Sequence, residues 1–389
     1  MLLRHLITAL LVFIGSAMLG CASTTPVVAK NPYPALHDHL FPSYASFPIE
    51  TEEEVFALEE DAQLFVDEAV FESGGKTTNV KGLISSIFDH SEMGLLYRSN
   101  ANSVASETFY NRSANCLSLS IMTYAMAQHA GYDATFYEVD IPEYWTRRDG
   151  FSFLNGHVNL TINVPKDPLV TNIGPSSADV DFDPQMIRTH FPRVPVTKRL
   201  VLSMFYNNKG ADALIANSYT RAYSYFRAAA VLSPELQQSW VNLGVLYRMV
   251  DAFEAAEQSY QFALNLDENN LTAWDNLSIL YYHQGLFDKS AQIKAKVEAQ
   301  RKENPFYHFI LGEQALDEGE LADALEHFQR ALRLDNTRHE VFFGLAKVYY
   351  EIGDISNAER YIKRAIQLAP NSQDENRYMS KLSTIALNY

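Results

Sequence analysis

Three residues in the middle of the chain have side chains that together could perform nucleophilic chemistry on a carbonyl carbon. Cys116 supplies a thiol, His157 an imidazole that can carry its proton, and Asp181 a carboxylate that can orient the imidazole. Such a set of side chains is suited to nucleophilic catalysis, in which the sulfur attacks the carbonyl carbon and the imidazole moves the proton.

The sequence around Cys116 predicts a helix that begins at the thiol. Asn115 is a favourable N-cap, the residues after Cys116 are apolar almost all round, and Gly131 suits the position beyond the helix end. Unpaired amides and the dipole at a helix N-terminus favour a thiolate, and the same amides can hold an oxyanion. We therefore expect a buried helix with Cys116 in its first turn.

Two strands are predicted to carry the histidine and the aspartates. Residues 157–164 alternate strictly between polar and apolar side chains, with His157 on the polar face. Residues 179–183 alternate in the same way, and their aspartates share one face. A further strand is predicted over residues 134–139, followed by a loop that contains Pro142 and Trp145.

The order of these elements, a helix with an N-terminal cysteine, then a strand with histidine, then a strand with aspartate, resembles the transglutaminase-like superfamily. This superfamily includes bacterial periplasmic cysteine proteinases on a papain-like α+β core, and the resemblance covers roughly residues 80–192. It implies a catalytic triad of Cys116, His157 and Asp181, with Asp183 as the alternative. It implies no cofactor and no resident metal; calcium could bind the aspartates, but the sequence does not indicate it.

Each of these residues also has an ordinary structural explanation. A cysteine in a buried helix is usually core, a histidine at a strand end is usually at the surface, and aspartates on a polar face often serve solubility. Two observations favour the triad: the three roles fall on suitable elements in the right order, and Cys116 is the only free thiol if Cys21 is modified. A lone free thiol in an oxidising compartment suggests a reactive role.

The second half of the chain repeats itself every 34 residues without a slip in register. The units begin at Ser203, Gln237, Leu271, Pro305 and His339. Small residues recur at positions 8, 20 and 27, and aromatic residues recur at position 24. This pattern resembles the tetratricopeptide repeat (TPR), in which paired helices approach closely and stack into a solenoid. Lys209 and Lys294 replace core residues in the first and third units, so the first unit is expected to pack against the preceding domain.

The TPR resemblance implies a concave face that binds an extended protein or peptide. By register, the residues predicted to bind it are Arg248, Tyr282, Phe309, Phe343, Lys347 and Tyr350. The alternative is a spacer or dimer surface whose aromatic residues belong partly to the core.

The N-terminal segment predicts export. Arg4 precedes a largely apolar run over residues 6–19, too short to span a bilayer comfortably, and residues 18–21 (MLGC) resemble the lipobox of bacterial lipoproteins. This implies lipidation at Cys21 and a location in the bacterial cell envelope, at the outer membrane facing the periplasm. The alternative is an ordinary secretory signal cut near Ala22.

The composition excludes one class of partner. The chain has 389 residues and a formal net charge of -16, and such an acidic balance argues against binding nucleic acid. The expected organisation is a signal peptide (1–20), a tether (21–50), a transglutaminase-like α+β domain (51–202), an all-α solenoid of five TPR units (203–372) and a capping helix (373–389).

Two hypotheses of function follow from these patterns. In the first, the chain is a membrane-anchored, periplasmic cysteine peptidase or amidase whose repeats recruit a protein or peptide substrate. In the second, it is a catalytically inactive lipoprotein adaptor, a scaffold for envelope protein complexes. The adaptor would not require a reactive Cys116, whereas the enzyme would.

Overall fold

The computed structural model of the chain describes residues 33, 35–72, 80–92, 96–97, 101–111, 113–148, 151–163, 177–182, 191–369 and 372–387. The fold below is that of residues 35–389, which form one compact unit. The predicted signal peptide, the lipidation site Cys21 and the alternative triad member Asp183 lie outside the described residues.

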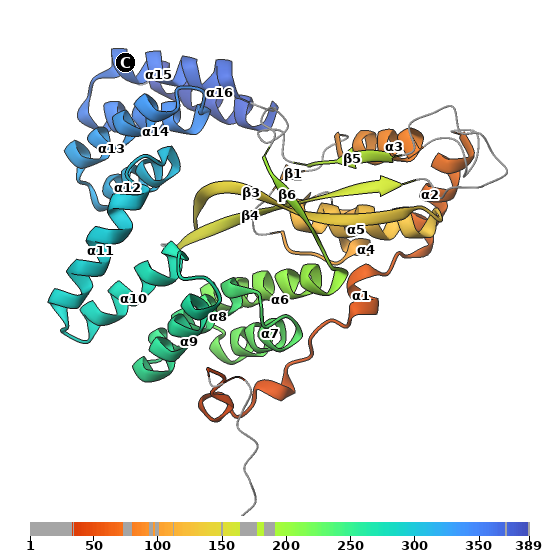
Figure 1. The fold of residues 1–389 in the computed structure, drawn as a ribbon. Coiled ribbons are helices and arrows are strands. Elements are labelled where there is room, and N and C mark those ends of the chain that lie inside the picture. The colour runs from red at the N-terminus through yellow and green to blue at the C-terminus, as the bar shows by residue number, and fades with distance from the viewer. Residues whose placement is uncertain are drawn as a thin grey trace, which may run out of the picture. The chain divides into compact units, whose positions relative to one another are not determined.

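The first half of this unit combines short helices with one antiparallel sheet (Figure 1). Its helices are η1 (Asp38–Leu40), η2 (Tyr44–Ser46), α1 (Glu52–Phe56), α2 (Glu60–Glu72), α3 (Val80–Glu92), α4 (Ala105–Asn111) and α5 (Cys116–His129). Its strands are β1 (Leu96–Tyr97), β2 (Ser113–Ala114), β3 (Asp133–Arg148), β4 (Phe151–Asn163), β5 (Ser177–Val180) and β6 (Arg193–Val196). Strands β1 and β2 form a small parallel pair.

The main sheet has the strand order β5-β4-β3-β6, and helix α5 packs on β3 and β4. Leu160 and Ile162 of β4 are fully buried in the core that they share with Ile121 and Met126 of α5. The helix predicted from Cys116 is confirmed: it ends at His129, and Gly131 beyond it has a φ of +79°. The helix is buried on nearly every side, which explains its continuous apolar sequence.

Two strand predictions were wrong in extent. The loop expected after residue 139 is instead a continuation of β3, which pairs with β4 as far as Arg148. The pairing is interrupted only between Val139 and Tyr144, around Pro142, whose nitrogen has no hydrogen to donate. Trp145 is buried against a repeat helix, and this contact supports the outer part of the strand. The third strand ends at Val180, so Asp181 follows the strand instead of lying within it.

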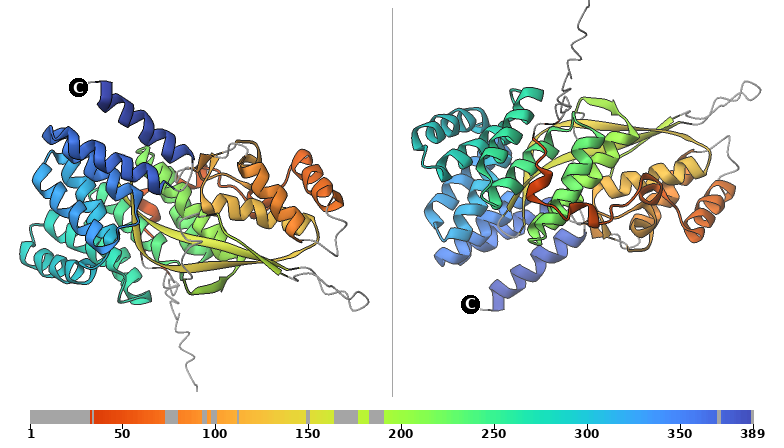
Figure 2. Two further views of the ribbon diagram at one scale, coloured as in Figure 1. Left: turned by 90° about the horizontal axis from the view of Figure 1, so that it is seen from above. Right: turned by 90° about the horizontal axis from the view of Figure 1, so that it is seen from below.

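The second half of the unit consists of helix pairs, as the repeat register predicts (Figure 2). The pairs are α6 (Lys198–Ile215) with α7 (Tyr219–Leu232), α8 (Gln237–Met249) with α9 (Phe253–Leu266), α10 (Leu271–His283) with α11 (Phe287–Arg301), α12 (Pro305–Glu318) with α13 (Leu321–Leu334), and α14 (His339–Ile352) with α15 (Ile355–Leu368). Helix α16 (Ser372–Leu387) follows the last pair and packs on α15. No described helix is long and apolar enough to cross a bilayer.

Small residues let the paired helices approach closely. A methyl group added to Gly312 would lie 2.8 Å from the ring of Phe328, and one added to Gly210 would lie 2.6 Å from the ring of Phe226. The alanines at positions 20 and 27 of the second unit, Ala256 and Ala263, are fully buried. The recurring small and aromatic positions are therefore two sides of one contact.

The first helix pair shares its core with the sheet domain. Val201 and Phe205 of α6 and Tyr225 of α7 are almost completely buried in the same hydrophobic cluster as Ile121 and Leu160. The tether predicted over residues 21–50 needs a correction, because residues 35–50 are packed against the repeats. Phe41 stacks on Tyr223 with ring centroids 4.5 Å apart, and Arg227 forms an ion pair of 2.7 Å with Asp38. Aromatic stacking and a paired charge hold this segment in place.

Candidate active site

The N-terminus of α5 holds Cys116 at the edge of a cavity. The side chain of Asn115 caps the helix by accepting a hydrogen bond of 2.9 Å from the backbone of Ser118, and its amide donates to Asn102 at 2.6 Å. Ser120, one turn further along α5, donates to the Val158 carbonyl at 3.1 Å. This bond fixes the helix to the strand that carries His157, because Val158 is the next residue.

His157 and Asp181 meet across strands β4 and β5. The His157 Nε2 atom lies 2.9 Å from one carboxylate oxygen of Asp181 and 3.0 Å from the other. Asn159 donates to the same carboxylate at 3.1 Å, and Thr161 donates to Asp179 at 2.6 Å. Polar residues on one face of β4 are therefore matched by aspartates on and just beyond β5, as the alternation of both segments predicts.

The surroundings of His157 favour its protonated form. Burial opposes the charge, since only 2% of the residue is exposed, but hydrogen bonds with Asp181 and Cys116 and the electrostatic interactions with both side chains outweigh it. Together they raise the pKa of His157 to about 10. The imidazole therefore carries a proton at neutral pH.

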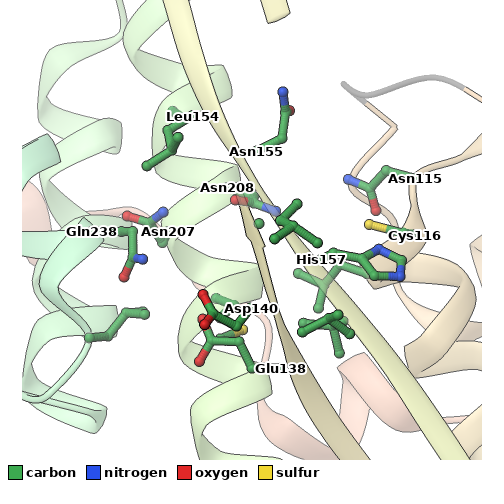
Figure 3. Close-up of a pocket in the computed structure, with 18 of the residues that line it drawn as sticks. Asn115, Cys116, Glu138, Asp140, Leu154, Asn155, His157, Asn207, Asn208 and Gln238 are labelled. Atoms are coloured by element: carbon green, nitrogen blue, oxygen red, sulfur yellow. The ribbon is translucent and has the colours of Figure 1, made fainter. Parts of the chain in front are cut away.

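The structure brings Cys116 and His157 to the same wall of the cavity. Figure 3 shows the sulfur of Cys116 beside the His157 ring. Because Nε2 of His157 faces Asp181, Nδ1 is the nitrogen left to face the thiol. A cysteine sulfur that has given its proton to a carboxylate-bound imidazole can perform acyl transfer, with the imidazolium as the proton donor to a leaving amine.

The cavity has a volume of about 550 Å³ and is shared between the sheet domain and the first repeats. One side is formed by Cys116 and His157, and the other by Asn207 and Asn208 of α6 with Gln238 of α8 (Figure 3). Asn207 is held by a 2.9 Å hydrogen bond from Asn242. The thiol of Cys116 therefore shares its cavity with residues of the first two repeats.

The cavity is rich in acidic groups. Glu138 and Asp140 lie two residues apart on β3 and point into it side by side (Figure 3). Burial, and then the charge of Asp140, raise the pKa of the Glu138 carboxyl. Among the described residues that line the cavity there is no lysine or arginine. A substrate segment in this cavity would therefore meet an acidic surface.

Three of the six residues predicted to bind a peptide come together in a second cavity of about 390 Å³. Phe309, Phe343 and Lys347 line it, and Lys347 forms an ion pair of 2.7 Å with Glu313. Trp145 of strand β3 lines the same cavity.

The other three residues predicted to bind a peptide line neither cavity. In the second repeat, burial raises the pKa of Tyr260 to about 12, and the charge of Arg248 acts in the opposite direction. Tyr282 is 62% exposed, and Tyr350 packs beside Phe342 in the last repeat. The six residues therefore do not form a single surface in this structure.

The sequence did not reveal the residues that join the two halves of the unit. Arg301, the last residue of α11, is 3% exposed and binds Glu143 of β3. A buried arginine at a repeat terminus has no signature of its own in the 34-residue register. The one available signal was Trp145, a large apolar residue in a segment that was expected to be a loop.

Comparison with known proteins identifies the repeats. A family model described as tetratricopeptide repeat matches residues 315–379, so the C-terminal region is a TPR solenoid. The human protein O-mannosyl-transferase TMTC3 is 23% identical over 181 residues, which cover 42% of this chain and 20% of that protein. Superkiller protein 3 of Saccharomyces cerevisiae is 30% identical over 124 residues, which cover 30% of this chain and 8% of that protein. The chain thus spans about a fifth or less of these relatives.

Two solved structures are each similar to about half of the chain. Pseudomonas aeruginosa PilF is 20% identical, with a TM-score of 0.29, and the match covers 49% of this chain and 86% of that one. The TPR protein TTC0263 of Thermus thermophilus is 18% identical, with a TM-score of 0.32, covering 48% of this chain and 99% of that one.

Proposed function

We propose that this chain is an adaptor that binds a protein partner through the concave surface of its TPR solenoid. The observation that carries the proposal is the cavity in which Phe309, Phe343 and Lys347 gather, because it combines aromatic surface with charge at repeat positions that suit an extended peptide. Solenoids of stacked helix pairs offer such surfaces for protein recognition.

The experiment is site-specific crosslinking in cells, with a benzophenone amino acid in place of Phe309. A crosslinked partner should be lost in a Lys347→Glu variant, because the reversed charge lies in the cavity. The matched control is Lys363→Glu, which reverses a charge on α15 that is 56% exposed and pairs with Glu359. Equal loss in both variants, or no loss in either, would count against the proposed surface.

A second function, cysteine acyl transfer of the transglutaminase-like type, is supported by the contacts of His157. It forms hydrogen bonds with Asp181 and Cys116, and the side chains of His157 and Cys116 line the cavity of about 550 Å³. Such an enzyme would act on a protein or peptide that the repeats hold, since repeat residues line the same cavity.

The proposed reaction uses the chain, its substrate and water. The Cys116 thiolate, whose proton His157 holds, attacks an amide carbonyl carbon, and the backbone amides at the start of α5 would stabilise the oxyanion. The carbon–nitrogen bond then breaks, and the amine leaves with the proton from His157. Water gives a proton to His157 as it adds to the resulting thioester, the carbon–sulfur bond breaks, and the acid is released with the thiolate and the imidazolium restored.

Alkylation kinetics separate the enzyme from the adaptor. Cys116 in the folded chain should react with iodoacetamide near neutral pH much faster than free cysteine does, and His157→Ala should slow the reaction. His129→Ala is the matched control, since this histidine lies at the other end of the same helix, where its ring bonds to Asp67 at 3.2 Å. A folded wild-type chain whose Cys116 is inert would exclude the enzyme and leave the adaptor intact.

We also propose that Cys21 is acylated and anchors the chain in the bacterial envelope, facing the periplasm at the outer membrane. The support is the sequence over residues 18–21 alone. Mass spectrometry of the mature N-terminus should find a lipid-modified cysteine, and Cys21→Ser should release the chain from membranes. A soluble chain that begins at Ala22 would support ordinary secretion.

A further inference from the structure

The outer part of the β3–β4 hairpin, residues 143–148 and 151–155, reaches the repeat helices and contacts α12 (Figures 1 and 2). We call it the hairpin arm. We propose that the arm is an internal ligand of the TPR groove, and that the external partner is an extended segment with a glutamate followed two residues later by a tryptophan, which competes with the arm. The inference rests on the proposed partner-binding function.

Arg301 forms the binding site for the glutamate of this motif. Arg301 donates from Nε to one oxygen of the Glu143 carboxylate at 2.9 Å and from a terminal nitrogen to the other at 3.0 Å. Its remaining terminal nitrogen donates to Asp275 at 2.8 Å. The Arg301 side chain is only 3% exposed and binds the carboxylate through two parallel hydrogen bonds. This geometry favours a carboxylate over other groups.

The tryptophan occupies an apolar pocket beside this arginine. Trp145 is 6% exposed and packs against Phe306 and Ile310 of α12. The Arg301 guanidinium lies 4.8 Å from the Trp145 ring centroid, so one arginine contacts both members of the motif. The Asn304 side chain donates to the Glu143 backbone carbonyl at 2.9 Å, which adds recognition of the main chain.

Part of this binding site lies at positions that recur from repeat to repeat. Thr272 and Asp275, which both accept hydrogen bonds from Arg301, are positions 2 and 5 of the third unit, and Phe306 is position 2 of the fourth. Glu143 and Trp145 are two residues apart, so they lie on the same side of an extended chain. An external strand with the same spacing would reproduce both contacts.

The neighbouring cavity provides space for the rest of such a partner. It is lined by Trp145 together with Phe309, Phe343, Lys347 and Lys381. An external segment that took the place of Trp145 would extend directly into it. The predicted peptide-binding residues would then contact the partner beyond its tryptophan.

Displacement of the arm would also change the thiol cavity. Ile141 and Glu143 of β3 and Leu154 of β4 line the cavity that holds Cys116. Because the arm is tethered, its effective concentration is high, and the groove of the wild-type chain is largely occupied. A partner therefore binds with an affinity that is lowered in proportion to the fraction of chains whose groove is free. When it binds, it moves the arm and opens one wall of the thiol cavity.

The test uses a fluorescent peptide with the sequence of residues 140–146 (DIPEYWT) and measures anisotropy. The peptide should bind the Trp145→Ala chain at least about tenfold more tightly than the wild-type chain, because the internal competitor is weakened. Adding Arg301→Met should reverse that gain, and a peptide with its glutamate and tryptophan replaced by glutamine and alanine should not bind. Glu143→Ala is a second variant that weakens the arm without altering the tryptophan.

Hydrogen exchange of the wild-type chain provides an arm of the test that needs no variant. Excess peptide should increase hydrogen exchange at residues 140–146. Exchange in α2, which packs on α3 and α5, should stay unchanged. If the peptide binds neither folded variant and exchange does not change, the inference is overturned. If crosslinking at Phe309 still depends on Lys347 in that case, the adaptor proposal stands and only the identity of the partner falls.

Discussion

Hydrogen bonds join the polar side chains of β4 around His157 to two aspartates, Asp179 and Asp181. Asp181 accepts from both His157 and Asn159, and Asp179 accepts from Thr161 and from Arg193 at 3.0 Å. These hydrogen bonds hold the imidazole in one orientation, because Asn159 also binds the carboxylate that His157 contacts. The carboxylate is 21% exposed, so its charge is only partly screened by water.

At this scale we expect Asp181→Asn to lower the pKa of His157 below 10. Asparagine keeps the shape but removes the negative charge that favours the imidazolium. A group with a raised pKa keeps its proton until the pH passes that value, so wild-type His157 should stay protonated from pH 6.5 to about 10. NMR titration of the imidazole signals measures this directly, and a wild-type ring that loses its proton near pH 6.5 would contradict it.

At the scale of elements, the helix pairs depend on contacts between one small and one aromatic residue. Phe328 of α13 is fully buried, and it lies between Gly312 of α12 and Gly344 of α14. Methyl groups added to these glycines would approach its ring to 2.8 and 2.5 Å. Since the ring is confined from both sides, it has no direction in which to move away.

We therefore expect Gly312→Ala to lower the free energy of unfolding. Overpacking costs about 1–3 kcal/mol, which exceeds the gain of about 1 kcal/mol from replacing glycine by alanine in a helix. Thermal or denaturant unfolding measures the change. Gly156→Ala is the control, because an added methyl group there meets no atom within 4 Å. Equal effects of the two substitutions would contradict the packing argument.

The sequence predicts repeat elements well because their contacts are local and periodic. Each helix pair buries residues at fixed positions, so small and aromatic side chains recur in register. The hairpin arm was missed because its stability comes from Trp145 and Arg301, which are 156 residues apart. The positions of Cys116 and His157 could be predicted because helix capping and strand alternation fix each locally. Asp181 lies beyond the end of its strand, and Asn207 and Gln238 reach the cavity only through tertiary contacts.

At the scale of the whole molecule, the repeats and the sheet domain are not separate bodies joined by a linker. Helices α6 and α7 contribute Phe205 and Tyr225 to the core beneath the sheet, and the Tyr206 hydroxyl donates to the Glu50 carbonyl at 2.5 Å. Residues 35–50 cross back over the repeats, where Tyr247 donates to the Ala35 carbonyl at 3.0 Å. The predicted boundary at residue 202 therefore divides a continuous core.

This arrangement predicts how shortened chains behave. A chain of residues 33–202 would expose the apolar surface that Phe205, Tyr225 and Ala229 cover, and each large side chain that is lost from a core costs about 3–5 kcal/mol. That sum approaches the whole stability of an average domain, about 5–15 kcal/mol. We expect this chain not to unfold cooperatively, whereas residues 33–236, which keep α6 and α7, should show one sharp transition by circular dichroism. Cooperative unfolding of the shorter chain would show that the sheet domain does not need the first repeat.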